Sequence, residues 1–393
     1  GLVGSEMCIR DRMYTDKSGK SVAGPDAEGF NPYESYRRAI RTLFSEMGNN
    51  KEMIFYRMDN AAGTMQYDRM PNKSGNTNDY RGGSLLGATQ EMVDAYFMAN
   101  GMSPVTGYAA DGVTPIINEA SGYKEDGTSS SDYKSADGTL YAPAGTRNMY
   151  VNREPRFYAS VAFNGAFWAL ASAQDGDRRN QQVWYYRGSD NGRKNSSDYW
   201  IPTGIGVMKF VSPNDCNTNN GRIYDKVDIP LRYTDILLMY AEALNELTPS
   251  SSYEVTTWEG EPITVSRNTE EIRKAVLPVR MRAGVPDYNE ETYNDQTLFR
   301  KKLIHERQVE FMGENQRYYD LRRWKLAPVE ESEQIYGYNV LMTESKKERF
   351  YERIRVENLQ ANFSRKMYFW PMPQNELKRN RKMTQAPGWE TFD

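Results

Sequence analysis

The sequence predicts a mainly α-helical fold in which helical hairpins form a scaffold and a loop-rich lobe carries short strands. Apolar residues recur at helical spacing in consecutive segments from residue 228 onward. Residues 59–150 are instead dominated by Gly, Asn, Ser, Asp, Thr and Tyr, which is typical of loops. Since 393 residues exceed one compact core, we expect a loop-rich lobe with part of the scaffold over 13–227 and a helical-repeat region over 228–393.

The first half contains few regular elements. Residues 31–47 carry apolar side chains at helical spacing and predict a helix, and residues 51–58 predict a strand. One short helix is expected near residues 87–101, inside the long loop region. Short strand-like runs follow at 157–165, 181–188 and 204–212.

The second half predicts two helical hairpins. Residues 228–247 predict a helix with Asp228 as N-cap and Pro230 in its first turn. Its expected inner face is Leu237, Tyr240, Ala241, Leu244 and Leu247. The next helix begins after Asn268, which has Glu271 three residues on, and ends at Gly284. Its expected inner face is Ile272, Ala275, Val276 and Val279. A second pair at 295–313 and 316–326 indicates stacked repeats of the tetratricopeptide kind.

Composition excludes several classes of function. A net charge of −3 without a long basic run gives nucleic acid no binding surface, and no apolar run is long enough to span a bilayer. Two cysteines exclude a disulfide framework and a cysteine-based metal site. A zinc site or a Ser-His-Asp triad would depend on the single histidine, His305. We therefore expect no metal, no cofactor and no catalytic residue, and we interpret the calcium-loop fragment "DGDRRN" as a turn.

The segment "HERQVEFMGENQRYYDLRRW" gathers charges that resemble an active site. Glu306 and Glu310 lie one helical turn apart, a spacing that paired carboxylates in glycoside cleavage can have. Interleaved arginines would hold them ionised, however, whereas a general acid needs a raised pKa. The pattern therefore favours an ion network between helices, with His305 as a satisfied interior or rim histidine.

Six motifs in order resemble the SusD/RagB family of cell-surface nutrient-binding lipoproteins. They are "QEMVDAYFMANG", "NREPRFYASVAFNG", "DIPLRYTDILLMYAEALNE", "VRMRAGV", "IHERQVEFMGENQRYYDLRRW", and "YFWPMPQNELKRN" followed by "QAPGW". The resemblance implies a SusD-like fold and non-catalytic capture of a nutrient, most often an oligosaccharide. It further implies delivery to a SusC-like TonB-dependent transporter at the outer membrane. A peptide-binding member of the family, a glycoside hydrolase and a pure helical-repeat scaffold remain as alternatives.

Residues 1–12 form neither a signal peptide nor a helical or strand pattern. We interpret Leu2 to Asp11 as the translation of a sequencing adapter joined to a reading frame that starts mid-gene. An unstructured native N-terminus is the alternative. Members of the resembled family normally begin with a signal peptide, an acylated cysteine and two further helical repeats. We therefore expect the signal and the lipid anchor to be absent from this fragment.

Sugars offer C–H faces that stack on aromatic rings and hydroxyl groups that suit polar side chains. The scaffold helices use their apolar faces for packing, so the loop-rich lobe is expected to bind the ligand. Within it, rings flanked by Gly, Asn, Asp or Ser are expected to be exposed. The predicted ligand-binding residues are Tyr67, Arg81, Tyr123, Tyr141, Trp168 and Trp184.

Overall fold

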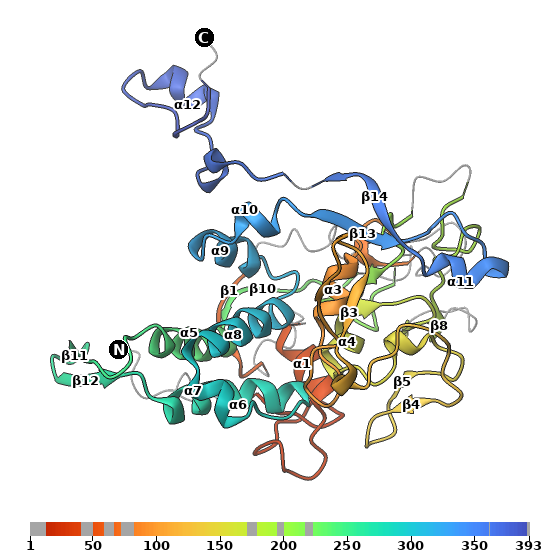
Figure 1. Cartoon of the computed structure of the whole chain (residues 1–393), viewed down its shortest axis with the longest axis horizontal. Coiled ribbons are helices and arrows are strands. Elements are labelled where there is room, and N and C mark those ends of the chain that lie inside the picture. Colours follow the sequence, from red (N-terminus) through yellow and green to blue (C-terminus); the bar gives the residue numbers. More distant parts are fainter. Residues whose placement is uncertain are drawn as a thin grey trace.

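The computed structural model describes residues 13–40, 50–58, 67–71, 82–170, 179–194, 200–216, 223–360 and 362–390. The long helices of the C-terminal half gather on one side of the molecule, and the loops and short strands gather on the other (Figure 1). Helices from the N-terminal half lie between the two parts (Figure 1). The predicted mainly helical fold with a strand-bearing lobe is confirmed.

The helices of the described residues are α1 (Pro32–Ile40), α3 (Gln90–Ala95), α4 (Pro155–Ser160), α5 (Tyr233–Asn245), α6 (Thr269–Ala283), α7 (Glu290–Asn294), α8 (Gln296–Glu310), α9 (Gln316–Arg323), α10 (Ala327–Glu330), α11 (Lys347–Phe350) and α12 (Gln374–Arg379). The strands are β1 (Met53–Arg57), β2 (Val105–Tyr108), β3 (Pro115–Ile117), β4 (Tyr133–Lys134), β5 (Leu140–Ala142), β6 (Val161–Ala162), β7 (Phe167–Trp168), β8 (Gln181–Gln182), β9 (Gly206–Val207), β10 (Asp228–Arg232), β11 (Ser252–Thr256), β12 (Pro262–Ser266), β13 (Gln334–Tyr338) and β14 (Arg353–Gln360). Every sheet among them is an antiparallel two-stranded ribbon.

Helices α5, α6 and α8 pack around one apolar core. The side chain of Asn268 accepts hydrogen bonds from the N–H groups of Glu270 and Glu271, which confirms the predicted N-cap of α6. Gly284 ends α6 at a φ of 75°, the left-handed conformation that glycine adopts without strain. The predicted inner face of α6 is buried in full: Ile272, Ala275, Val276 and Val279.

The predicted start and inner face of α5 are wrong in part. Residues 228–232 form strand β10, which pairs with β1, so the helix begins only at Tyr233. Asp228 is therefore no N-cap; instead the carboxylate of Asp235 accepts a hydrogen bond from the N–H of Arg232. Pairing with β1 supplies backbone partners that a helix start would lack, and this outweighs the local helix signal. Tyr240, expected inside, is 45% exposed.

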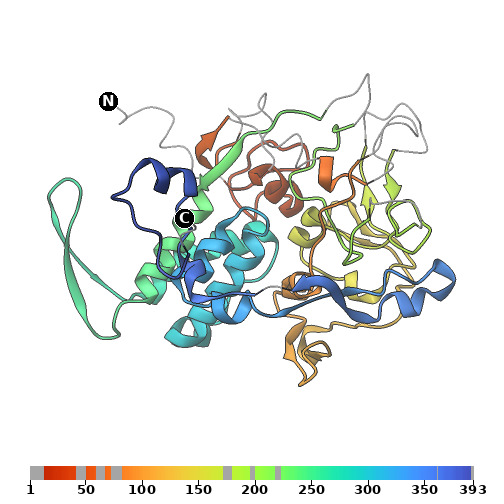
Figure 2. The same ribbon diagram turned by 90° about the horizontal axis from the view of Figure 1, so that it is seen from above.

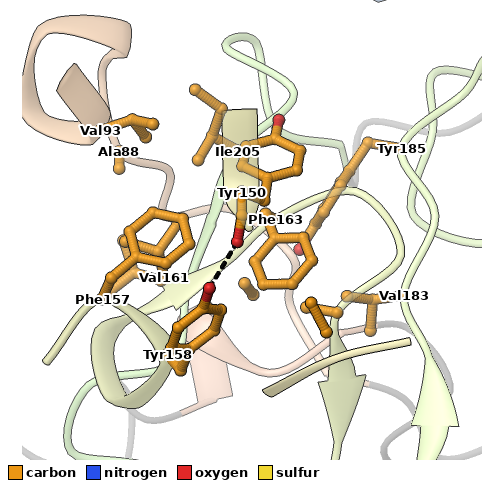
Figure 3. Close-up of a cluster of buried hydrophobic side chains, with 14 of the residues drawn as sticks. Ala88, Val93, Tyr150, Phe157, Tyr158, Val161, Phe163, Val183, Tyr185 and Ile205 are labelled. Carbon is orange, nitrogen blue, oxygen red and sulfur yellow. Dashed lines mark hydrogen bonds between the residues drawn. The ribbon is translucent and has the colours of Figure 1, made fainter. Parts of the chain in front are cut away.

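The core of the loop-rich lobe is aromatic (Figure 3). Phe157 and Tyr158 lie on α4, not on the expected strand, because Pro155 fits the first helical turn. The Tyr158 hydroxyl donates a hydrogen bond of 2.6 Å to the Tyr150 carbonyl oxygen (Figure 3). The rings of Tyr150 and Phe163 stack with centroids 4.7 Å apart. This core fixes the loops that surround it.

Two ribbons position the segments at 163–166 and 181–184. Strand β6 pairs with β9, and β7 pairs with β8, so the turn at 163–166 lies beside residues 181–184. Pairing is short in both ribbons, and the walls of the lobe are mostly turns. Expected strands at 181–188 and 204–212 are thus confirmed only at β8 and β9.

Two segments extend from the body. Strands β11 and β12 form a hairpin that projects beside the helical half, with Trp258 at its turn (Figure 2). The C-terminal segment with α12 extends away from the body above α9 and α10 (Figure 1). Residues 1–12, residues 41–47 of the first predicted helix and Arg81 lie outside the described residues. Within the described part, no helix is long and apolar enough to cross a membrane.

Candidate functional site

The charged segment at 305–324 builds a buried ion network. The Arg156 Nη1 atom lies 2.7 Å from the Glu306 Oε1 atom and 2.9 Å from the Glu310 Oε2 atom. Arg280 pairs with Glu306 at 2.7 Å, and Arg282 pairs with Glu310. All five side chains are essentially inaccessible to solvent. They join α4, α6 and α8, so the predicted ion network between helices is confirmed.

The pKa values of these carboxyl groups follow from their partners. Burial by itself raises the pKa of Glu306, but Arg156 and Arg280 lower it to about 2. The pKa of Glu310 is likewise lowered, because Arg282, Arg232 and Arg156 outweigh its burial. A carboxyl group held ionised cannot donate a proton to a leaving group at neutral pH. Glu306 and Glu310 therefore do not fit the role of the general acid that glycoside cleavage requires.

His305 is an interior histidine of the scaffold. Its Nε2 atom lies 2.6 Å from the Ala95 carbonyl oxygen, and its ring centroid is 4.5 Å from that of Phe97. Burial lowers the pKa of His305 to about 4. A neutral imidazole that donates to a carbonyl joins α8 to the end of α3.

Three of the predicted ligand-binding rings belong to the core. Tyr123 and Tyr141 are 4% and 7% exposed, so the expectation that they are exposed is wrong. Trp168, the ring of the predicted set expected nearest to the core, is 3% exposed. The Tyr123 ring lies over Arg153 and its hydroxyl donates to Glu125, while the Tyr141 ring stacks on Tyr158 with centroids 4.6 Å apart. Polar neighbours in the sequence did not predict exposure, because a loop-rich lobe has to build its core from loop residues.

Tyr67 does not line the cavity described below that contains Trp184. Tyr67 is half-buried, and its carbonyl oxygen accepts hydrogen bonds from the N–H groups of Met70 and Gly83. Arg81 lies outside the described residues, so its predicted role stays a prediction.

Trp184 is a predicted ring that is exposed and that lines an open cavity. The Trp184 side chain is 37% exposed and stacks on Tyr186 with centroids 5.8 Å apart and planes 13° apart. The cavity, named here the Trp184 cavity, has a volume of about 230 Å³. Its walls are Thr128, Pro143, Ala144, Gly145, Thr146, Arg147, Asn164, Gly165, Gln182, Trp184, Tyr186, Glu344, Lys347, Glu348 and Tyr351.

Trp184 faces outward from the segment that follows β8. Its neighbours Val183 and Tyr185 point into the aromatic core (Figure 3), whereas Gln182 and Trp184 line the cavity together with the buried Tyr186. The turn before β7 contacts the indole of Trp184 through Gly165. Gly165 has a φ of 94°, and a Cβ atom there would lie 3.1 Å from the Trp184 Cη2 atom. Glycine at 165 thus permits both the turn and the close approach of the ring.

Polar groups around the indole are held in place by hydrogen bonds. The Asn164 amide donates to the Tyr351 hydroxyl at 3.0 Å, and the Gln182 amide donates to the Gly165 carbonyl oxygen at 3.0 Å. Arg147 is 5% exposed and pairs with Glu348, whose side chain is 66% exposed. The cavity therefore offers an aromatic face, amides and carboxylates together, which suits a ligand with several hydroxyl groups.

Comparison with known families identifies the chain. The model of the SusD family matches residues 51–389. The chain belongs to the SusD family. The resemblance drawn from the six motifs is thereby confirmed.

Three SusD-like relatives show how far the similarity extends. SusD-like protein P2 of Formosa agariphila is 31% identical over 187 residues, which cover 47% of this chain and 30% of that protein. A SusD-like protein from Bacteroides fragilis NCTC 9343 has 26% identity and a TM-score of 0.60, with coverage of 91% of this chain and 57% of that chain. A SusD-like carbohydrate binding protein from the same strain has 19% identity and a TM-score of 0.55, with coverage of 89% and 60%. The chain thus spans between about a third and three-fifths of the length of these relatives.

Of the residues that line the Trp184 cavity in this SusD-family chain, only Trp184 itself was predicted from the sequence. Gln182 and Arg147 belong to none of the six motifs, Asn164 lies in a motif that does not mark it as a binding residue, and Glu348 lies more than 150 residues beyond Trp184. One signal was present in "QQVWYY": alternation about the buried Val183 places Gln182 beside Trp184 on the open face. The contact with residues 344–351 depends on tertiary packing, and no local pattern reports it.

Proposed function

We propose that this SusD-family protein binds an oligosaccharide in the Trp184 cavity outside the outer membrane, without chemically changing it. The proposal is carried by one observation: an exposed indole shares a cavity with amide, guanidinium and carboxylate groups. The indole offers a flat face to the C–H side of a sugar ring. The surrounding polar groups match the hydroxyl groups at the ring edge.

The relatives agree with a carbohydrate ligand. One of the solved relatives is described as a SusD-like carbohydrate binding protein. In keeping with the family, we further propose that the bound oligosaccharide is delivered to a SusC-like TonB-dependent transporter. The complete protein would then be a surface-exposed lipoprotein of the outer membrane.

Binding is favoured over catalysis by the state of the carboxylates. Glu306 and Glu310 are paired with buried arginines in the helical scaffold and do not line the Trp184 cavity. In the Trp184 cavity, Glu348 is paired with Arg147. The lowered pKa values of Glu306 and Glu310 keep both groups ionised at neutral pH, so neither can act as a general acid.

Calorimetric titration against pools of plant, algal and host oligosaccharides and against peptide pools tests the proposal. We expect heat of binding with one class of oligosaccharide and none with the peptides. Binding of peptides alone would assign the chain to the peptide-binding alternative. Release of new reducing ends from a bound oligosaccharide would contradict the non-catalytic role.

A further inference from the structure

A second cavity of about 400 Å³ opens in the loop-rich lobe. It is named here the Tyr141 cavity. Its walls are Tyr33, Thr139, Leu140, Tyr141, Tyr158, Phe163, Ala166, Phe167, Ala169, Asn180 and Met208. Apolar cavities of about 150 Å³ already admit a benzene molecule, so this cavity has room for an aryl group.

The two cavities differ in chemistry. The Trp184 cavity is lined by Arg147, Lys347, Glu344 and Glu348, whereas none of the described residues that line the Tyr141 cavity carries a carboxylate, ammonium or guanidinium group. The hydrogen-bonding groups of the Tyr141 cavity are uncharged hydroxyl and amide groups, and Leu140, Phe163, Phe167 and Met208 add an apolar surface against which the polar edge of a sugar ring would be desolvated. An uncharged apolar group gains free energy from the same burial.

Two segments of the chain contribute residues to both cavities. Residues 139–141 line the Tyr141 cavity and residues 143–147 of the same segment line the Trp184 cavity. The turn after β6 does the same, since Asn164 and Gly165 face one cavity while Phe163 and Ala166 face the other. The two cavities therefore lie next to each other, on either side of these two segments.

We infer that the Tyr141 cavity binds an uncharged aryl or acyl substituent of the oligosaccharide held in the Trp184 cavity. This inference rests on the proposed function and narrows its ligand class to esterified oligosaccharides. Phe167, which is 36% exposed, forms the open edge of the apolar cavity. The substituent packs against this ring and against Leu140 and Met208.

Two exposed alanines offer a matched pair of blocking variants. Ala169 lines the Tyr141 cavity and Ala144 lines the Trp184 cavity. Ala169→Phe places a ring in the mouth of the first cavity and Ala144→Phe places one in the mouth of the second, and since both alanines are exposed, neither ring has to displace a buried side chain. The uncharged dye N-phenyl-1-naphthylamine probes the apolar cavity without any sugar. We expect Ala169→Phe to weaken dye binding about tenfold or more, and Ala144→Phe to leave it unchanged.

Competition then tests the link between the cavities. Feruloylated arabinoxylan oligosaccharides should displace the dye, and the same preparation after saponification should not. Dye binding that survives Ala169→Phe, or equal displacement by both preparations, would overturn the inference. Failure of the proposed function has a different signature: titration of Trp184→Ala and the parent protein would then show equal affinity for the saponified oligosaccharides.

Discussion

The helical half and the loop-rich lobe place opposite kinds of side chain in their interiors. Around α4, α6 and α8, arginines and glutamates are buried as mutually neutralising pairs. In the lobe, tyrosines and phenylalanines form the core, and an indole with polar neighbours reaches solvent. Charges that are conspicuous in the sequence therefore hold the scaffold together, while an uncharged turn at residues 163–166 supports the candidate site.

Glu310→Gln tests the scaffold side of this comparison and should have the largest effect. The substitution removes a carboxylate that Arg156, Arg232 and Arg282 share, and so reduces the negative charge that compensates their burial. We expect the free energy of unfolding to fall by about 3–5 kcal/mol, measured by urea unfolding at pH 7. The control is Arg323→Ala: Arg323 pairs with Glu242, has a 42% exposed side chain and should cost about 1 kcal/mol or less. Equal costs for the two variants would contradict the account.

Gly165→Ala tests the lobe side. A side chain at a φ of 94° is strained, and its Cβ atom would press on the indole of Trp184. We expect a loss of about 1–3 kcal/mol in unfolding free energy together with a changed near-ultraviolet circular dichroism spectrum of tryptophan. Gly188→Ala is the matched control, because Gly188 has a φ of 87° but no atom within contact of the added Cβ. A change in the tryptophan signal that is the same in both variants would show that Gly165 does not support the ring.

His305 gives the comparison a dependence on pH. Its folded-state pKa is lowered from 6.5 to about 4, so its contribution to stability is complete above pH 6.5 and is lost as the pH falls toward 4. Burial raises the pKa of Asp235 to about 6, so protonation of Asp235 makes the folded state more stable as the pH falls through this range. The effect of His305 is therefore measured as the difference in unfolding free energy between the parent protein and the His305→Gln variant. Between pH 7 and pH 5, the parent should lose on the order of 1–2 kcal/mol more than His305→Gln. Parallel urea unfolding curves at pH 7, 6 and 5 measure this, and identical losses would refute the assignment.

The sequence predicted the scaffold better than the site. Asn268, Gly284 and the inner face of α6 were predictable because caps and helical periodicity are local signals. The start of α5 was not, since the pairing of β10 with β1 joins residues about 175 positions apart. Local propensity gives no information on such a partner.

The same limit applies to the predicted ligand-binding rings. Tyr123 and Tyr141 have polar neighbours in the chain, yet both lie in the core because distant rings and Arg153 pack on them. Trp184 differs because its two neighbours in the chain, Val183 and Tyr185, are both buried. Exposure in a loop-rich lobe thus follows from which side of a turn faces the core, and only the three-dimensional arrangement reveals it.

The affinity of Trp184→Ala for the oligosaccharide identified by titration tests the central claim most directly. Trp258→Ala is the matched control, because that indole is 87% exposed at the turn of the β11–β12 hairpin and lines neither the Trp184 cavity nor the Tyr141 cavity. If the Trp184 cavity binds the sugar, Trp184→Ala should lose about 1–3 kcal/mol of binding free energy, on the scale known for stacking on aromatic rings, while its melting temperature stays unchanged. Trp258→Ala should bind like the parent protein. Parental affinity in Trp184→Ala, or an equal loss in both variants, would contradict the account.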